Sequence, residues 1–393
     1  MATMTDGLLG QPMFQLMQVA DEMARNGRDV LHFEIGDLDF GSPPVAVDAA
    51  KLALDAGETG YADSRGLREM REAVAARVEA TLGFRPALGQ ILVSPANAVI
   101  DYVVRCVADP GEEVVIPDPC FPTYLAVLSY TGVRGRAVQL DFDAGFDMHP
   151  DRVAAAITDA TKLIVLNSPS NPTGGCLTKE SVREIARLAA ARDCLLLSDE
   201  VYASLSYDRP HYSPAGIDRC RERTIVLGSL SKSMAMAGWR LGYAIGPEPL
   251  IEKMSLLQET ILSCLPPFIQ RGGVAALTSS DAVTERILPP LRRRRDRLVA
   301  GLAALPGVEC AVPNGAFYAF PRIDHPTLND VEYALRLLSE EAICVVPGSH
   351  FGPGGAGFVR FSYSAAPLEN IEAALERLGR FHTRHFERLR SGV

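Results

Sequence analysis

The sequence has no long apolar segment, and its N-terminus lacks the basic and apolar regions of a secretory signal peptide. No stretch of 18 uncharged apolar residues occurs among its 393 residues, so no segment has the length and composition of a membrane-spanning helix. We therefore expect a protein that has no membrane partner and stays in the cytoplasm. Its composition, 47% hydrophobic and 22% charged, is typical of a globular protein with room for more than one domain.

The sequence also lacks an excess of positive charge. Its formal net charge is −9, which argues against non-specific nucleic-acid binding, and we expect no nucleic-acid partner. A local exception is the run of arginines at positions 292–295. Because Asp296, Arg297 and Leu298 follow it, we interpret this run as the solvated face of a helix.

Closely spaced cysteines are absent as well. The eight cysteines are scattered without a Cys-x-x-Cys pair, and several lie inside apolar runs. This pattern favours reduced thiols in the core, and we expect neither a disulfide framework nor a metal site. No internal repeat or low-complexity segment interrupts the chain.

What the sequence does contain is a regular alternation of short apolar segments and helical segments between residues 90 and 209. Strands are predicted at 91–94, 113–116, 135–140, 162–167 and 194–199, with helices such as 98–108 and 178–192 between them. A helix at 12–26 and a strand at 30–35 are predicted before this region, and a long helix at 281–305 and an antiparallel sheet after it. The alternation predicts a three-layer α/β domain with a mostly parallel sheet, whose ligands bind at the carboxyl ends of the strands.

Backbone and side-chain groups that can bind ligands follow several of these predicted strands. Ala96, Asn97 and Ala98 begin a helix after the first strand, where free backbone N–H groups and the helix dipole suit a phosphate. Asp199 ends the apolar strand 194–199, and a carboxylate at such a depth is costly unless it is paired. The residues alone leave a helix cap or a buried ion pair as the alternative for Asp199.

Lys232 follows an apolar, strand-like segment at 224–227 and lies among small residues and methionines. A lysine that forms a Schiff base with an aldehyde needs its neutral form, which a partly desolvated pocket favours. Ser229, Ser231 and Arg240 lie close to it in sequence and carry the donors that a dianionic phosphate requires. The alternative is a surface lysine in a loop rich in serine and methionine.

The segment around Lys232 resembles a known motif. Ser-x-Ser-Lys at 229–232, followed by Gly-Trp-Arg-Leu-Gly at 238–242, is similar to the cofactor-lysine motif of the class I/II aminotransferases, fold type I enzymes that use pyridoxal 5'-phosphate (PLP). Asn-Pro-Thr-Gly at 171–174 and Asp-x-x-Tyr at 199–202 also match the family, and Arg360 follows in the family's order. The resemblance spans almost the whole chain and implies that Lys232 binds PLP as a Schiff base.

The resemblance also implies roles for the residues around the cofactor. Asp199 would keep the pyridinium nitrogen protonated, Asn171 and Tyr202 would hydrogen-bond the phenolate oxygen, and Phe121 would stack on the ring. Lys232, Asp199 and Tyr202 would be the catalytic residues. The implied phosphate ligands are Ala96, Asn97, Ala98, Ser229, Ser231 and Arg240.

The substrate and the subunit contacts are implied in the same way. Arg360 would clamp the substrate α-carboxylate, with Asn171 and the backbone of Gly36 beside it, whereas an arginine on an edge strand is the alternative for Arg360. Tyr61 would reach the phosphate of a neighbouring subunit, which implies a homodimer with shared active sites; a tyrosine covering the core beneath a turn is its alternative. Leu38 stands where the family usually has proline, and Pro95 where it has a Gly/Ser-rich turn.

These implications combine into one expected architecture and one expected reaction. We expect a large PLP-binding domain at residues 45–285 and a smaller α+β domain formed by residues 1–44 and 286–393. The expected reaction moves the amino group of an L-amino acid to a 2-oxo acid. Another PLP reaction at Cα, such as β-elimination, decarboxylation or cyclisation, is the first alternative, and a PLP-sensing or structural module is the second.

Overall fold

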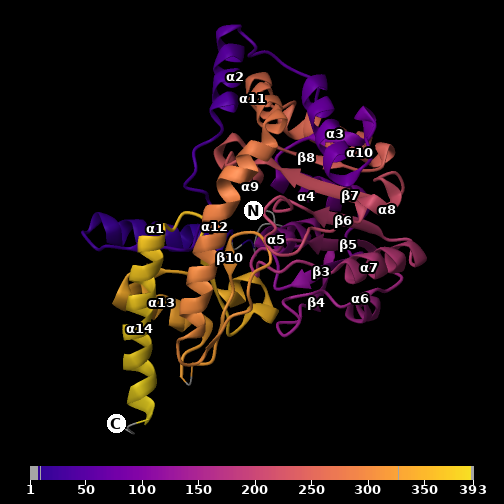
Figure 1. Ribbon diagram of the computed structural model, residues 1–393. Helices are drawn as coiled ribbons and strands as arrows, with labels where there is room; N and C mark the ends of the chain where they lie inside the picture. The colour runs from indigo at the N-terminus through magenta and orange to yellow at the C-terminus, as the bar shows by residue number, and fades with distance from the viewer. Residues whose placement is uncertain (1–7, 9, 326, 391–393) are drawn as a thin grey trace, which may run out of the picture.

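The computed structural model describes residue 8 and residues 10–325 and 327–390 (Figure 1). Residues 1–7, 9, 326 and 391–393 of the expected small domain lie outside the described residues.

A seven-stranded sheet forms the centre of the larger part of the molecule, with the strand order β2-β8-β7-β6-β5-β3-β4. Its strands are β2 (Ile91–Val93), β3 (Glu113–Asp118), β4 (Arg134–Gln139), β5 (Thr161–Asn167), β6 (Leu195–Asp199), β7 (Thr224–Ser229) and β8 (Gly242–Ile245). The pairs β3–β4, β3–β5, β5–β6 and β6–β7 are parallel, whereas β8 is antiparallel to β2 and β7. The predicted mostly parallel sheet is therefore confirmed.

Helices cover both faces of this sheet and make the three expected layers (Figure 1). One face packs on α4 (Ala96–Val107), α5 (Pro122–Thr131) and α10 (Glu248–Leu262), and the other on α6 (Pro150–Ala156) and α7 (Lys179–Ala191). Successive side chains of a strand point to opposite faces, and in β3 Val114 and Ile116 join the first cluster while Val115 joins the second. Thr178 caps α7, because its hydroxyl accepts a hydrogen bond from the Ser181 N–H at 3.1 Å.

A smaller part of the molecule combines segments from both ends of the chain. The long helix α12 (Ser280–Ala303) leads into it, and α13 (Asp330–Glu341), α14 (Leu368–Arg390) and the N-terminal α1 (Pro12–Arg25) lie together there (Figure 1). β1 (Leu31–His32) pairs in parallel with β12 (Ile343–Cys344), so residues about 310 positions apart meet. The predicted antiparallel strands are β9 (Val308–Glu309) with β11 (Arg322–Ile323), and β10 (Tyr318–Ala319), β14 (Val359–Ser362) and β13 (Val346–Pro347).

Five further helices complete the described part of the larger region. They are α2 (Pro44–Asp55), α3 (Arg68–Leu82), α8 (Ala215–Asp218), α9 (Leu230–Ser233) and α11 (Pro267–Thr278). Helices α2, α3 and α11 lie together at the end of the molecule opposite α14 (Figure 1). No helix in the described ranges has both the length and the apolar character needed to cross a membrane.

The interpretation of the arginine run at 292–295 was wrong for two of its members. Arg294 and Arg295 are buried in α12, with 8% and 4% of their surface exposed. Arg294 pairs with Asp39 at 2.6 Å and Arg295 with Asp208 at 2.5 Å. Both acids lie far away in sequence, and these long-range partners let the charges leave solvent.

Two other expectations have clear outcomes. The strand predicted at 30–35 is shorter in the structure, where β1 has only two residues. After β1 the backbone forms hydrogen bonds with different elements at different residues and does not continue along one neighbouring strand. The eight cysteines form no disulfide with one another; five are buried and three are half-buried.

Candidate active site

A cavity of about 500 Å³ opens at the carboxyl ends of β5, β6 and β7, where Asn167, Asp199 and Ser229 line it. This is the edge at which parallel α/β sheets bind ligands. All of the expected site residues except Ala98 and Tyr61 line the cavity: Gly36, Ala96, Asn97, Phe121, Asn171, Asp199, Tyr202, Ser229, Ser231, Lys232, Arg240 and Arg360. Ala98 is the third residue of α4, and Tyr61 is 92% exposed, so it does not cover the core of this chain.

Asp199 forms part of the buried wall of the cavity. Its Oδ2 accepts a hydrogen bond from the Tyr124 hydroxyl at 2.5 Å and its Oδ1 one from the Val201 N–H at 3.2 Å. Burial raises the pKa of Asp199 to about 6, and the bonds from Tyr124 and Val201 oppose this rise. Among the described residues, the groups that act on the Asp199 carboxylate are Tyr124, Val201 and Glu200, and none of them is a cation. The carboxylate therefore suits a cationic N–H donor supplied by a ligand.

Lys232 reaches the same cavity from α9, the short helix after β7. The Ser229 hydroxyl caps this helix by accepting from the Ser231 N–H at 3.1 Å, and the Lys232 ammonium donates to the Gly36 carbonyl. Burial lowers the pKa of Lys232 to about 8; the negative charge of Asp37 opposes this, and the positive charges of Arg240 and Arg360 add to it. A lysine in this state has an appreciable neutral fraction near pH 8 and can act as a nucleophile or a base.

One end of the cavity is polar and exposed. Arg240 and Asn97 are exposed there, and Ser229, Ser231 and Gly238 lie beside them. Helix α4 begins at Ala96, and its N-cap residue Pro95 makes no side-chain hydrogen bond to the first turn. The N–H groups of that turn and the Arg240 guanidinium together suit a phosphate.

The other end of the cavity is closed and contains Arg360. Only 1% of Arg360 is exposed; its Nη1 donates to Asn171 Oδ1 at 2.8 Å and its Nη2 to the Glu34 carbonyl. The guanidinium lies over the Tyr318 ring at 4.6 Å and over the Phe351 ring at 4.8 Å. Burial lowers the pKa of Arg360, and its buried Nε has no hydrogen-bond partner within the described chain. This group therefore suits a carboxylate ligand.

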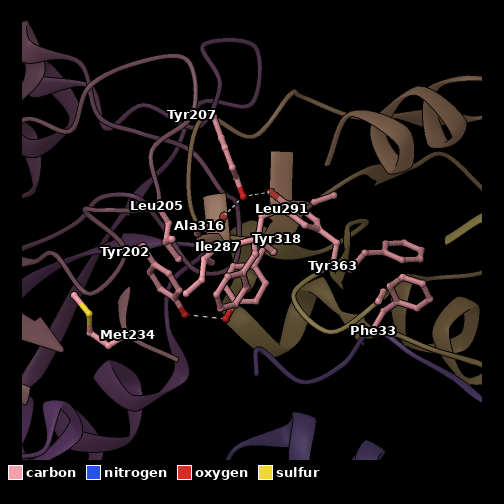
Figure 2. Packing of buried hydrophobic residues seen from close by; sticks show 14 of the residues in the cluster. Phe33, Tyr202, Leu205, Tyr207, Met234, Ile287, Leu291, Ala316, Tyr318 and Tyr363 are labelled. Carbon is pink, nitrogen blue, oxygen red and sulfur yellow. Dashed lines mark hydrogen bonds between the residues drawn. The ribbon is translucent and has the colours of Figure 1, made fainter. Parts of the chain in front are cut away.

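Two tyrosines that line the cavity, Tyr202 and Tyr318, form a hydrogen-bonded pair. The Tyr202 and Tyr318 hydroxyls are 2.8 Å apart and both side chains are buried (Figure 2). Burial raises the pKa of Tyr202 well above its ordinary value, so Tyr202 is a neutral hydrogen-bond donor at physiological pH. With an anion site, a buried carboxylate and a lysine in one cavity, the residues present fit PLP, which carries a phosphate, a ring nitrogen and an aldehyde.

Comparison with known proteins decides the family. A family model described as aminotransferase class I and II matches residues 28–378. The chain belongs to the class I and II aminotransferase family. Members of this family depend on PLP, so the protein is a PLP-dependent aminotransferase of fold type I that acts on amino acids and 2-oxo acids.

Individual relatives of this aminotransferase agree with the family match. It is 36% identical over 362 residues to the putative aminotransferase YugH of Bacillus subtilis, covering 92% of this chain and 93% of the relative. It is 37% identical over 345 residues to the arginine–pyruvate transaminase AruH of Pseudomonas aeruginosa, covering 87% and 88%. A solved structure of the Thermus thermophilus aspartate aminotransferase with maleate matches with a TM-score of 0.93 at 34% identity, covering 97% of this chain and 99% of that one.

The aminotransferase site also contains residues that the sequence did not single out. Tyr124 belongs to the segment after β3, and Tyr318 lies in the C-terminal part of the chain. Both hydrogen bonds join residues far apart in sequence, 75 positions for Tyr124 and Asp199 and 116 for Tyr202 and Tyr318. The one sequence feature that could have indicated Tyr124 is its position three residues after Phe121, on the first turn of α5.

Proposed function

We propose that Lys232 holds PLP through a Schiff base and transfers protons during transamination. The observation that carries this proposal is the Lys232 amine, whose pKa burial lowers to about 8, in the same cavity as the buried carboxylate of Asp199. A low pKa makes the neutral, reactive amine accessible near neutral pH. PLP, when bound, supplies a ring that accepts the electrons released when a bond to the substrate Cα breaks.

The other residues of the cavity hold the cofactor in this proposal. Asp199 binds the protonated ring nitrogen, the Asn171 amide and the Tyr202 hydroxyl bind the phenolate oxygen, and Phe121 packs on the ring. The phosphate ligands are the backbone of Ala96, Asn97 and Ala98 and the side chains of Ser229, Ser231 and Arg240. Support comes from their common position around one cavity, with Ala98 in the first turn of α4 beside it.

Arg360 binds the α-carboxylate of the substrate in this proposal, with Asn171 and the Gly36 backbone beside it. The burial of Arg360 supports the assignment, because a buried guanidinium with an unpartnered Nε requires an anionic partner. With the carboxylate fixed, the freed Lys232 Nζ removes the proton from the substrate Cα and later returns a proton as a general acid.

We also propose that the active unit is a homodimer in the cytoplasm, in which Tyr61 completes the phosphate site of the neighbouring subunit. The 92% exposure of Tyr61 within one chain supports a contact outside that chain. Mixed refolding of Tyr61→Phe and Lys232→Ala proteins tests the shared site. Recovered activity above that of either variant alone supports the dimer, and a monomer in light scattering that still turns over contradicts it.

The domain boundaries remain part of the proposal. Residues 45–285 form the large PLP-binding domain, and residues 1–44 and 286–393 form the small domain. The pairing of β1 with β12 supports the contribution of both ends of the chain to one unit. Because residue 285 lies inside α12, limited proteolysis is expected to cut first near residue 44, where α2 begins, and to leave the boundary near residue 285 intact.

One experiment tests the reaction itself. Holoenzyme is mixed with a panel of L-amino acids without an acceptor, and cofactor absorbance and released products are followed by spectroscopy and mass spectrometry. The proposal expects one equivalent of 2-oxo acid per active site, followed by return of the original absorbance when a 2-oxo acid is added. Continued consumption of a donor without an acceptor, with release of ammonia or carbon dioxide, would show that transamination is not the main activity.

A further inference from the structure

The backbone between Phe33 and Gly41, here called the N-terminal strap, forms one side of the cavity. Ile35, Gly36 and Asp37 of the strap line the cavity. The strap also packs closely, because a Cβ atom added to Gly36 would lie 2.1 Å from the Tyr318 hydroxyl oxygen. A small shift of this segment would therefore change the shape of the cavity.

Successive carbonyl groups of the strap are held by different elements. The Ser362 N–H donates to the Phe33 carbonyl at 2.7 Å, and the Ser364 hydroxyl to the Ile35 carbonyl at 3.4 Å. Arg360 donates to the Glu34 carbonyl, which lies between those two in the chain, and Lys232 donates to the Gly36 carbonyl, which follows them. The last two tethers come from the residues that the proposed function assigns to the substrate carboxylate and to PLP. In the working enzyme the Lys232 amine has the cofactor as its partner and the Gly36 carbonyl loses this tether, so the strap needs support elsewhere.

That support comes from the buried part of the arginine run. Arg294 of α12 donates to both carboxylate oxygens of Asp39, at 3.0 and 2.6 Å, and its Nη1 also donates to the Ser364 carbonyl at 2.6 Å. Its guanidinium lies 5.6 Å from the centre of the Phe40 ring. This is a bidentate, charge-assisted contact on a largely buried arginine, and it ties the strap to both α12 and the segment after β14.

We infer that Arg294 is a positioning residue for the substrate, which acts through Asp39 to hold the strap against the cavity. Arg294 does not line the cavity. The strap borders the substrate throughout the reaction, so its position affects binding of the ground state and of the transition state alike. Loosening it is expected to raise KM more than it lowers kcat. This inference rests on the proposed function, because it assumes that Lys232 and Arg360 bind the cofactor and the substrate.

Arg295 provides a matched control. It is the next residue of α12, is buried to a similar extent and pairs with Asp208 at 2.5 Å. Its other contacts are Asp296, the Pro313 carbonyl and the Tyr207 ring, which all lie outside the strap. Arg294→Lys and Arg295→Lys both keep the charge and lose the planar fork. Each is therefore expected to lower Tm by a similar amount, whereas only one of them loosens the strap.

The experiment measures kcat and KM for donor and acceptor in the holoenzymes of wild type, Arg294→Lys, Arg295→Lys and Asp39→Asn. We expect Arg294→Lys and Asp39→Asn each to raise KM for both substrates about tenfold with kcat within about twofold, and Arg295→Lys to leave KM unchanged. The double variant Arg294→Lys/Asp39→Asn should match the worse single variant, because both changes break the same contact. Unchanged KM in both single variants, or an equal rise in Arg295→Lys, would overturn the inference. A wild-type enzyme that does not transaminate would instead overturn the proposed function.

Discussion

The two ends of the cavity each contain an arginine, and the two arginines differ in nearly every physical respect. Arg360 is 1% exposed, lies against two aromatic rings and donates to Asn171 and to the strap. Arg240 is exposed, and its Nη1 donates to the nearby Ala237 carbonyl at 2.7 Å. A buried guanidinium is positioned by packing before any ligand arrives, whereas an exposed one is free to reorganise around its ligand.

This difference indicates that the two ends reach their working geometry in different ways. The closed end already brings Arg360, Asn171 and Asp199 together, buried, within a single chain. Under the function proposed above, the open end, with Arg240 and Asn97, would take its final form when the phosphate and the second subunit bind. We therefore expect substitutions in the closed end to affect catalysis strongly and substitutions in the open end to affect mainly cofactor affinity.

The largest effect is expected at the buried carboxylate. Asp199→Ala should lower kcat/KM by roughly 10²–10⁴-fold, because the loss of one partner of a buried charge pair typically costs about 3–5 kcal/mol. Tyr124→Phe is the matched control, since it keeps the carboxylate and removes only the hydrogen bond at 2.5 Å. Its effect should be smaller, about 10–100-fold. Steady-state kinetics with saturating PLP measure both, and equal losses would contradict the assignment of the charge to Asp199.

The second effect concerns the closed end. Arg360→Ala should lower kcat/KM by roughly 30–1000-fold for every amino donor, because a bidentate charged contact contributes about 2–4 kcal/mol. Arg360→Lys should recover only part of this, since a point charge does not reproduce the fork. A loss of kcat/KM confined to donors with one class of side chain would show that Arg360 contacts the side chain and not the α-carboxylate.

The third effect, at the open end, is expected to be modest. Arg240→Lys should weaken PLP affinity by about tenfold or less, because lysine keeps the positive charge and loses only the planar fork. Titration of apoprotein with PLP, followed by absorbance, measures this affinity. A loss as large as that of Arg360→Ala would remove the contrast between the two ends.

The smallest effect is a shift on the pH axis. Because burial lowers the pKa of Lys232 to about 8, its neutral fraction rises about tenfold between pH 7 and pH 9. The rate at which apoprotein binds PLP should rise with it and level off above pH 9. Asp37 opposes this lowering, so Asp37→Asn should lower the pKa further and move the midpoint to lower pH. Asp151→Asn, an exposed change on α6, should leave the midpoint in place.

The sequence was a good guide where the signal was local, and it failed where partners lie far apart. Strand ends and motif spacing correctly predicted that Asn171, Asp199 and Lys232 lie around one cavity, because parallel strands end at a common edge. Local spacing cannot reveal that Tyr124 donates to Asp199. The same reason explains Arg294 and Arg295, which were interpreted as solvated although Asp39 and Asp208 pair with them across the fold.

The most direct test of the central claim is chemical labelling of the lysine. Holoenzyme is reduced with borohydride, digested and mapped by mass spectrometry, with Asp37→Asn protein treated in parallel because it keeps Lys232. We predict a single pyridoxyl-phosphate adduct, on Lys232, in both proteins. An adduct on another lysine, or no adduct on protein that retains Lys232 and has been saturated with PLP, would contradict the proposed active site.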